Sequence, residues 1–130
     1  MVIDPSAIVA MIEGKPGNQE LLSRCMSSDR IQLSAAGFLE AAIVLDNRNA
    51  ATCLTELDEL LDNLGVTIVP VTPAQARIAR RAHREYGRGS GHPARLNSGD
   101  CFSYALSKDT GEPLLFKGDD FSRTDVVRAI

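Results

Sequence analysis

The segment Val66-Thr67-Ile68-Val69-Pro70-Val71-Thr72-Pro73-Ala74-Gln75 holds the clearest strand of the chain and, directly after it, a helix start. Residues 66–71 are mostly β-branched, which favours a strand, although Pro70 restricts its far end. Residues 72–75 have the form of a capping box with proline at the first helical position. A strand that passes directly into a helix is the repeating unit of an α/β fold.

The same alternation of strands and helices continues on both sides of this segment. Further short strands are predicted at Met1 to Asp4, Ile31 to Ser34 and Pro113 to Phe116, with a short edge strand at Asp125 to Val127. Helices are predicted at 5–13, at 18–26 with Asn18 as its cap, at 35–48, 50–64 and 73–86, and from Asn97 or Ser98 to Gly111. This order predicts a mainly parallel sheet covered by helices on both faces. The 35–48 helix is apolar nearly all round, so we expect it to be buried.

The composition indicates one ordinary globular domain over residues 1–130, with 44% hydrophobic and 24% charged residues. No apolar stretch approaches the roughly 20 residues needed to cross a bilayer, so we expect no membrane segment. The three cysteines, Cys25, Cys53 and Cys101, are odd in number and widely spaced. This spacing argues against a zinc or disulfide framework, and we expect a cytoplasmic protein.

Acidic residues occupy positions where a charge is hard to explain structurally. Asp4 ends the first apolar run, Glu40 lies inside an apolar helix, and Asp100 opens a helix. Asp119 and Asp120 follow the last apolar run. In a parallel sheet, ligands bind beyond the carboxyl ends of the strands, where these carboxylates are expected to converge. Clustered carboxylates repel one another unless a cation is present, and Mg²⁺ or Mn²⁺ suits an all-oxygen site.

Most of these acids also have a purely structural explanation. Asp4 and Asp100 could cap the helices that follow them, and Asp119 and Asp120 could be turn residues after a glycine. Glu40 has no such capping role, because apolar residues flank it on both sides. The joint pattern therefore favours a cation site for phosphoester hydrolysis.

Basic residues gather in one part of a chain whose net charge is −3. Six of the 14 lysines and arginines lie between Arg77 and Arg95, against one acid in that segment. A helical stripe is predicted for Arg77, Arg80, Arg81, Arg84 and Arg88. The stripe is a phosphate-binding surface, a solvated helix face or a contact for a partner protein.

The chain resembles the PIN-domain ribonucleases, and more narrowly the VapC toxins of bacterial type II toxin–antitoxin pairs. The resemblance rests on Met1-Val2-Ile3-Asp4-x-Ser6-Ala7, Leu39-Glu40, Leu96-Asn97-x-Gly99-Asp100-Cys101 and Pro113-Leu114-Leu115-Phe116-Lys117-Gly118-x-Asp120-Phe121. It implies a PIN-like α/β/α sandwich, a homodimer, and a Mg²⁺- or Mn²⁺-dependent endoribonuclease acting on RNA. It also implies inhibition by a VapB-type antitoxin.

The resemblance also implies roles for single residues. Asp4 and Asp100 correspond to the main metal ligands, Glu40 to the acid that positions or deprotonates water, and Ser6 to a residue that supports the metal site. Many members carry another acid where this chain has Gly118, which leaves Asp119 or Asp120 as the fourth acid, with a preference for Asp119. RNA binding is assigned to Arg80, Arg84 and Arg88.

Two other readings remain open from the sequence. A catalytically inactive PIN-like module would bind a partner protein through the same surface. A phospho-acceptor domain of flavodoxin-like form also gathers acids at strand ends, but it needs an acceptor Asp after a middle strand. The obvious candidate strand ends in Val69-Pro70-Val71-Thr72, which contains no acid.

Overall fold

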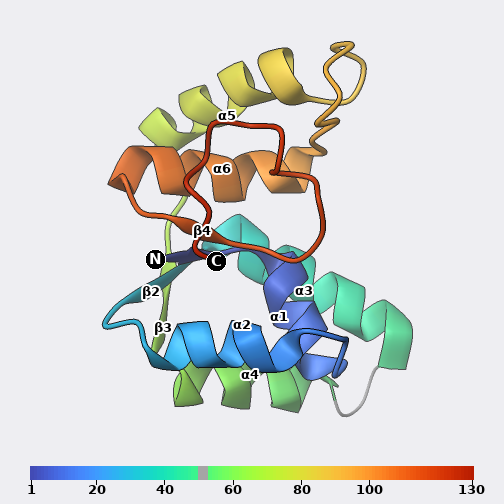
Figure 1. The fold of residues 1–130 in the computed structure, drawn as a ribbon, viewed down its shortest axis with the longest axis vertical. Helices are drawn as coiled ribbons and strands as arrows, with labels where there is room; N and C mark the ends of the chain where they lie inside the picture. Colours follow the sequence, from blue (N-terminus) through green and yellow to red (C-terminus); the bar gives the residue numbers. More distant parts are fainter. Residues whose placement is uncertain (50–52) are drawn as a thin grey trace.

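A computed structural model describes residues 1–49 and 53–130 as a three-layer α/β/α sandwich, which confirms the predicted fold class (Figure 1). Its four-stranded sheet has the order β3-β2-β1-β4, and every pairing between neighbouring strands is parallel. The strands are β1 (Val2–Ile3), β2 (Ile31–Ser34), β3 (Val66–Val69) and β4 (Leu114–Leu115). The helices are α1 (Pro5–Ile12), α2 (Asn18–Met26), α3 (Ala35–Asn49), α4 (Cys53–Asn63), α5 (Pro73–Tyr86) and α6 (Ser98–Thr110).

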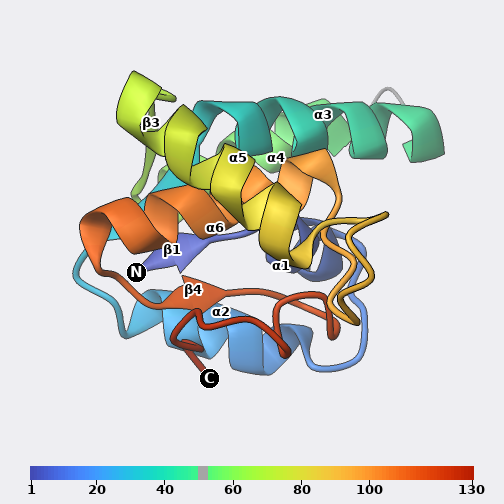
Figure 2. The ribbon, with the colours of Figure 1, turned by 90° about the horizontal axis from the view of Figure 1, so that it is seen from above.

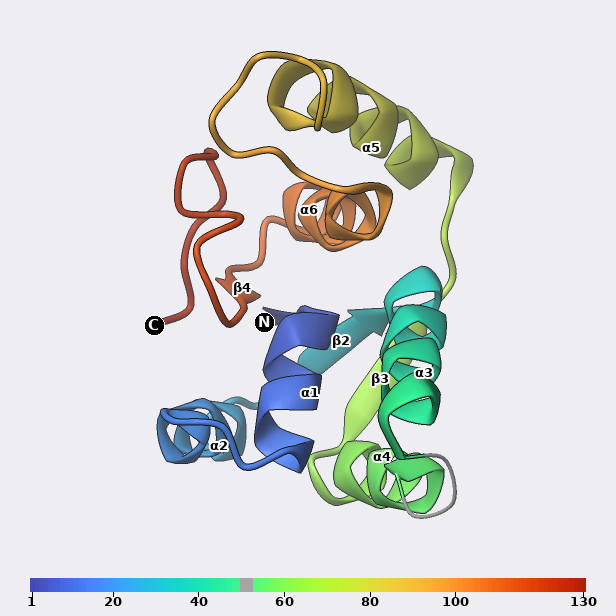
Figure 3. The same ribbon diagram turned by 90° about the vertical axis from the view of Figure 1, so that its right-hand side faces the viewer.

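Each face of the sheet packs against its own group of helices. Ile3, Leu33 and Leu115 belong to the core shared with α1 to α4, whereas Val2 and Leu114 belong to the core shared with α5 and α6. Figure 3 shows α5 and α6 above the strands, and α1, α2 and α4 below them. Because successive strand residues point to opposite faces, the short strand β1 contributes Val2 to one core and Ile3 to the other.

The helix starts follow the predicted chemistry in part. Thr72 caps α5 by accepting from the Gln75 N–H at 3.1 Å, and Pro73 is the first helical residue. The Gln75 side chain does not complete the capping box, because it donates to Asp109 on α6. The prediction for Asn18 is wrong, since α2 is capped by Gly17 without a side-chain hydrogen bond.

Two predictions about elements differ from the structure. The α3 helix is not fully buried, because the Leu39 and Ile43 side chains are 59% and 50% exposed. The short strand expected at 125–127 is replaced by a single bridge between Leu114 and Arg128. The first residues of the helix predicted at 50–64 lie outside the described residues. Among those described, no helix combines the length and apolar character needed to cross a bilayer.

Candidate active site

Three of the predicted acids converge at the carboxyl ends of the strands. Asp4 directly follows β1 and caps α1, and its own N–H donates to the Leu115 carbonyl of β4 at 2.9 Å. Glu40 lies on α3, which follows β2, and Asp100 lies in the first turn of α6. The parallel sheet therefore brings residues that are far apart in sequence to one edge.

Asp4 is the most buried of these acids, with 3% of its surface exposed. Its Oδ2 accepts from the Ser6 N–H at 2.9 Å and from the Ser6 hydroxyl at 2.5 Å. Its Oδ1 is buried and has no hydrogen-bond partner. Burial raises the pKa of Asp4, and this effect exceeds the lowering by the hydroxyls of Ser103 and Ser6. Ser103 Oγ makes no hydrogen bond, so its hydroxyl dipole acts on Asp4 from a longer distance.

Asp100 is held by the helix start that contains it. Its Oδ2 accepts from the Asn97 N–H at 2.9 Å, while its own N–H donates to Asn97 Oδ1 at 2.8 Å, which forms a reciprocal capping box. The pKa of Asp100 is raised to about 7, chiefly by burial and further by the charges of Asp4, Asp120 and Glu40, while the Asn97 hydrogen bond lowers it. The predicted capping role and the place of Asp100 beside the other acids are therefore compatible.

Glu40 reaches the start of α6 because residue 99 has no side chain. A Cβ placed on Gly99 would lie 2.5 Å from Glu40 Oε2 and 2.6 Å from Glu40 Oε1. Burial raises the pKa of Glu40, and the nearby charge of Asp4 adds to the effect. The sequence patterns do not mark Gly99 as a site residue, although a glycine in the first turn of a helix is itself a signal of close approach.

The two acids after β4 face different surroundings. The charge of Asp120 raises the pKa of both Asp4 and Asp100, so it lies within their electrostatic range. Asp119 instead lines a hollow of about 280 Å³ together with Glu20 and Arg128. We call Asp4, Glu40, Asp100 and Asp120 the acidic centre.

The acidic centre suits a hard divalent cation that keeps part of its water. Among residues 1–49 and 53–130, no three His, Cys, Asp or Glu side chains are arranged to hold one ion. Mg²⁺ needs fewer protein ligands, because it is usually bound through one or two carboxylates and several waters. Asp4 Oδ1 is buried and makes no hydrogen bond. A bound cation would offset the energetic cost of burying this charged oxygen.

The arginines of α5 are exposed, and α5 packs side by side with α6. None of the ion pairs formed within the described residues includes Arg77, Arg80, Arg81 or Arg84. Arg88 does not extend the helical stripe, because α5 ends at Tyr86 and residue 88 lies in the following loop. That loop leads back to the start of α6, which carries Asp100, so the end of α5 lies on the same side of the molecule as the acidic centre (Figure 2).

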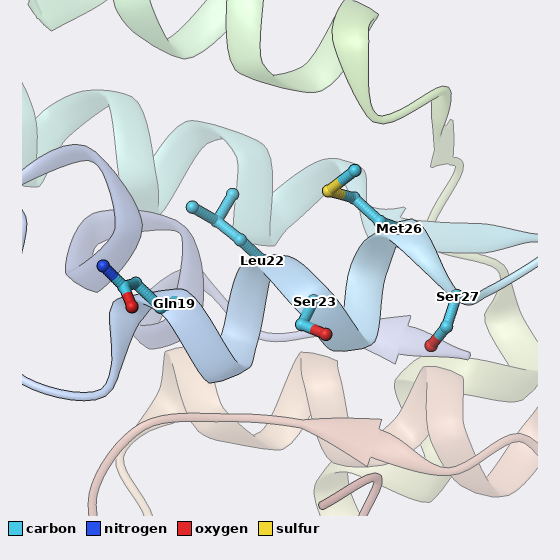
Figure 4. Close-up of a pocket in the computed structure, with 5 residues that line it drawn as sticks. All are labelled: Gln19, Leu22, Ser23, Met26 and Ser27. Carbon is cyan, nitrogen blue, oxygen red and sulfur yellow. The ribbon is translucent and has the colours of Figure 1, made fainter.

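Two hollows on the surface differ in their relation to the acids. One, of about 490 Å³, adjoins Glu40 and is lined by apolar residues that include Leu39, Ile43 and Phe102. The other, of about 470 Å³, is lined only by α2 residues and the Ser27 that follows them, and none of the acids contributes to it (Figure 4). The first hollow is therefore the one relevant to the site.

Comparison with known proteins agrees with this geometry. The PIN domain matches residues 1–127, so the chain belongs to the PIN-domain family. Within that family it groups with the VapC ribonucleases: it is 47% identical to Ribonuclease VapC42 of Mycobacterium tuberculosis over 126 residues, 97% of this chain and 96% of the relative.

Solved structures of lower identity share the fold. The crystal structure of Mycobacterium tuberculosis VapC20, a sarcin-ricin loop cleaving toxin, superposes with a TM-score of 0.74 at 17% identity and covers 97% of this chain and 95% of its own. A toxin–antitoxin complex from Klebsiella pneumoniae gives a TM-score of 0.71 at 14% identity, with coverages of 99% and 97%.

Proposed function

We propose that residues 1–130 form a single PIN-like nuclease domain, the toxin of a type II toxin–antitoxin system, which hydrolyses RNA phosphodiesters with Mg²⁺ or Mn²⁺. The observation that carries this proposal is the buried, unpartnered Oδ1 of Asp4, which lies beside two further acids at one edge of the sheet. The family membership and the VapC ribonucleases among the relatives support the endoribonuclease activity.

Each acid has a distinct role in the proposed reaction. Asp4 and Asp100 would hold the cation, which when bound would supply the positive charge that orients water and makes it more acidic. Glu40 accepts a proton from the attacking water, a role that suits a carboxyl whose pKa is raised. The water oxygen attacks phosphorus, the P–O3′ bond breaks, and the leaving 3′ oxygen takes a proton from solvent water, so the products carry 5′-phosphate and 3′-hydroxyl ends. We place Asp120 rather than Asp119 as the fourth acid, because its charge reaches Asp4 and Asp100.

The exposed arginines supply the proposed RNA contact. Arg80 and Arg84 lie on the solvent side of α5, and Arg88 lies in the loop that leads to the acidic centre. Their positive charge attracts the RNA backbone without reading its sequence.

A cognate VapB-type antitoxin is the proposed protein partner. The apolar hollow beside Glu40 supports this assignment, since Leu39 and Ile43 are half exposed there. A homodimer is also proposed, because β3 is an outer strand of the sheet with Ile68 44% exposed. We retain the cytoplasm as the location, since Cys25 and Cys101 are both free thiols.

A catalytically inactive binding module is not favoured, because Asp4, Glu40 and Asp100 are all present and the relatives are ribonucleases. The test is the chemistry of the products. Purified protein, free of antitoxin, is incubated with a 5′-labelled RNA pool in Mg²⁺, in Mn²⁺ and in EDTA. We expect labelled fragments with 3′-hydroxyl ends only when metal is present, and 2′,3′-cyclic phosphate ends would contradict the proposed water attack.

A further inference from the structure

Four buried polar atoms of the described side chains make no hydrogen bond. They are Asp4 Oδ1, Gln32 Oε1, Ser34 Oγ and Ser103 Oγ. An unpartnered buried polar atom costs about 1–3 kcal/mol, so such atoms call for an explanation. Each of these residues is at most 4% exposed, so bulk solvent is not the partner.

Three of the four atoms come from one face of the sheet. Val2 is in register with Gln32, and Val2 packs in the core beneath α6. Two residues further along each strand, Asp4 and Ser34 return to this same face. Asp4 directly follows β1 and Ser34 ends β2, so the two residues continue this register at the carboxyl ends of neighbouring strands.

Ser34 is not explained by helix capping. It directly precedes α3, a position at which serine usually accepts a hydrogen bond from the first turn. Its Oγ makes no such bond, although the residue is only 2% exposed. The hydroxyl is therefore available for another partner on the Asp4 side.

Ser103 approaches the Asp4 carboxylate from α6, in the helix layer that covers this face of the sheet. It lies three residues after Asp100 on α6, and therefore on the same helix face. The helix packs against both β1 and β2. The nearness of the Ser103 hydroxyl to Asp4 is also visible in its lowering of the pKa of that carboxyl.

We propose that Ser34 Oγ, Ser103 Oγ and Asp4 Oδ1 together bind one ordered water molecule, and that the two serines are positioning residues for Asp4. A buried water needs two to four polar partners, and these three oxygens supply them. With Ser6 on Oδ2, both carboxylate oxygens are then fixed, and the second lone pair of Oδ1 remains free for the cation. This inference rests on the proposed metal-dependent function.

The test measures Mn²⁺ affinity by calorimetry and by the electron paramagnetic resonance signal of free Mn²⁺, using the full chain. Ser34→Ala and Ser103→Ala should each weaken Mn²⁺ binding about tenfold, the size typical of changes behind a metal ligand. Because one water serves both hydroxyls, the double variant should lose little more than either single variant. Ser103→Thr, which keeps the hydroxyl, should restore the affinity.

Ser107→Ala is the matched control. Ser107 lies on the same face of α6 and is 3% exposed, but its hydroxyl donates to the Glu112 carbonyl at 2.7 Å. This variant should lose stability and keep its Mn²⁺ affinity. If Ser34→Ala and Ser103→Ala bind Mn²⁺ like the unmodified protein, the positioning role is wrong. If their losses are additive in the double variant, the shared water is wrong. If the unmodified protein binds no Mn²⁺, the proposed metal-dependent function fails, and this inference fails with it.

Discussion

Among the single residues, Asp100 links the acidic centre to the stability of the folded protein. Its pKa is raised from 3.8 to about 7 in the folded protein, so the folded state binds more protons than the unfolded state between these pH values. The stability of the metal-free protein should therefore fall as the pH rises from about 4 to about 7, and should then stay low.

Asp100→Asn removes this penalty. The metal-free variant should melt above the unmodified protein at pH 8, by about 4 °C for each kcal/mol of this penalty, with a difference that disappears towards pH 4. Thermal melts across this pH range in EDTA provide the check. Added Mg²⁺ should stabilise the unmodified protein more than the variant. A variant that melts lower at pH 8 would mean that the charged form of Asp100 stabilises the fold, which contradicts its raised pKa.

Gly99 leaves the space that Glu40 occupies. In Gly99→Ala, the new methyl group meets both carboxylate oxygens of Glu40, which must move away from the start of α6. We expect kcat for RNA cleavage to fall about 10- to 100-fold, because small displacements of a catalytic group have effects of this size. Mn²⁺ affinity should change less, since Asp4 and Asp100 remain.

Ser98→Ala is the control for this change, because residue 98 is exposed in the same turn of α6. It should cleave RNA at the unmodified rate. Equal activity of Gly99→Ala and Ser98→Ala would remove Glu40 from the proposed mechanism.

Among the secondary-structure elements, α5 carries the exposed arginines and α6 carries Asp100 of the acidic centre. Arg80→Glu combined with Arg84→Glu reverses two exposed charges without touching the packing between these helices. RNA affinity should fall, and the slope of log affinity against log salt should become shallower by about 0.7 for each phosphate that is no longer neutralised. Fluorescence anisotropy with a labelled RNA and EDTA present measures binding without cleavage.

Arg30→Glu provides the comparison, because Arg30 precedes β2 at the end of the sheet opposite the acids. Its effect on the salt slope should be small. An unchanged slope in the α5 double variant would mean that the stripe is only a solvated surface.

The strands and most helix starts could be predicted because their signals are local. Thr72 before Pro73, and Asn97 before Asp100, are capping patterns contained within a few residues. The contact between Glu40 and Gly99 could not be predicted in this way, since it depends on how α3 and α6 pack. The exposure of Leu39 is hidden from the sequence for a related reason, because an apolar pattern does not tell which face is left uncovered in a single chain.

Local sequence patterns also do not decide which of two neighbouring acids belongs to the site. Asp119 and Asp120 are adjacent in a turn, and only the three-dimensional path of that turn decides which one faces Asp4. The preference for Asp119 as a catalytic residue stays a prediction, and Asp120 is the acid whose charge reaches Asp4. The partner of Asp4 across the sheet, Ser34, likewise follows from strand register and not from sequence spacing.

For the protein as a whole, the open edge of β3 predicts self-association. Light scattering should show a dimer of two 14.0 kDa chains. Ile68→Lys places a charge on this edge and should shift the protein to the monomer. Val127→Lys is the control, since Val127 is 68% exposed outside the named strands. A monomeric unmodified protein, or a dimer that Ile68→Lys leaves intact, would contradict this interface.

Cleavage of RNA by the acidic centre with a divalent cation is tested most simply on total bacterial RNA. Antitoxin-free protein is incubated with this RNA in Mg²⁺, Mn²⁺ or EDTA, beside Asp100→Asn prepared in the same way. We expect discrete products that need the metal and that are absent with the variant. Cleavage that persists both in EDTA and with Asp100→Asn, after removal of contaminating nucleases, would contradict the proposed role of the acidic centre.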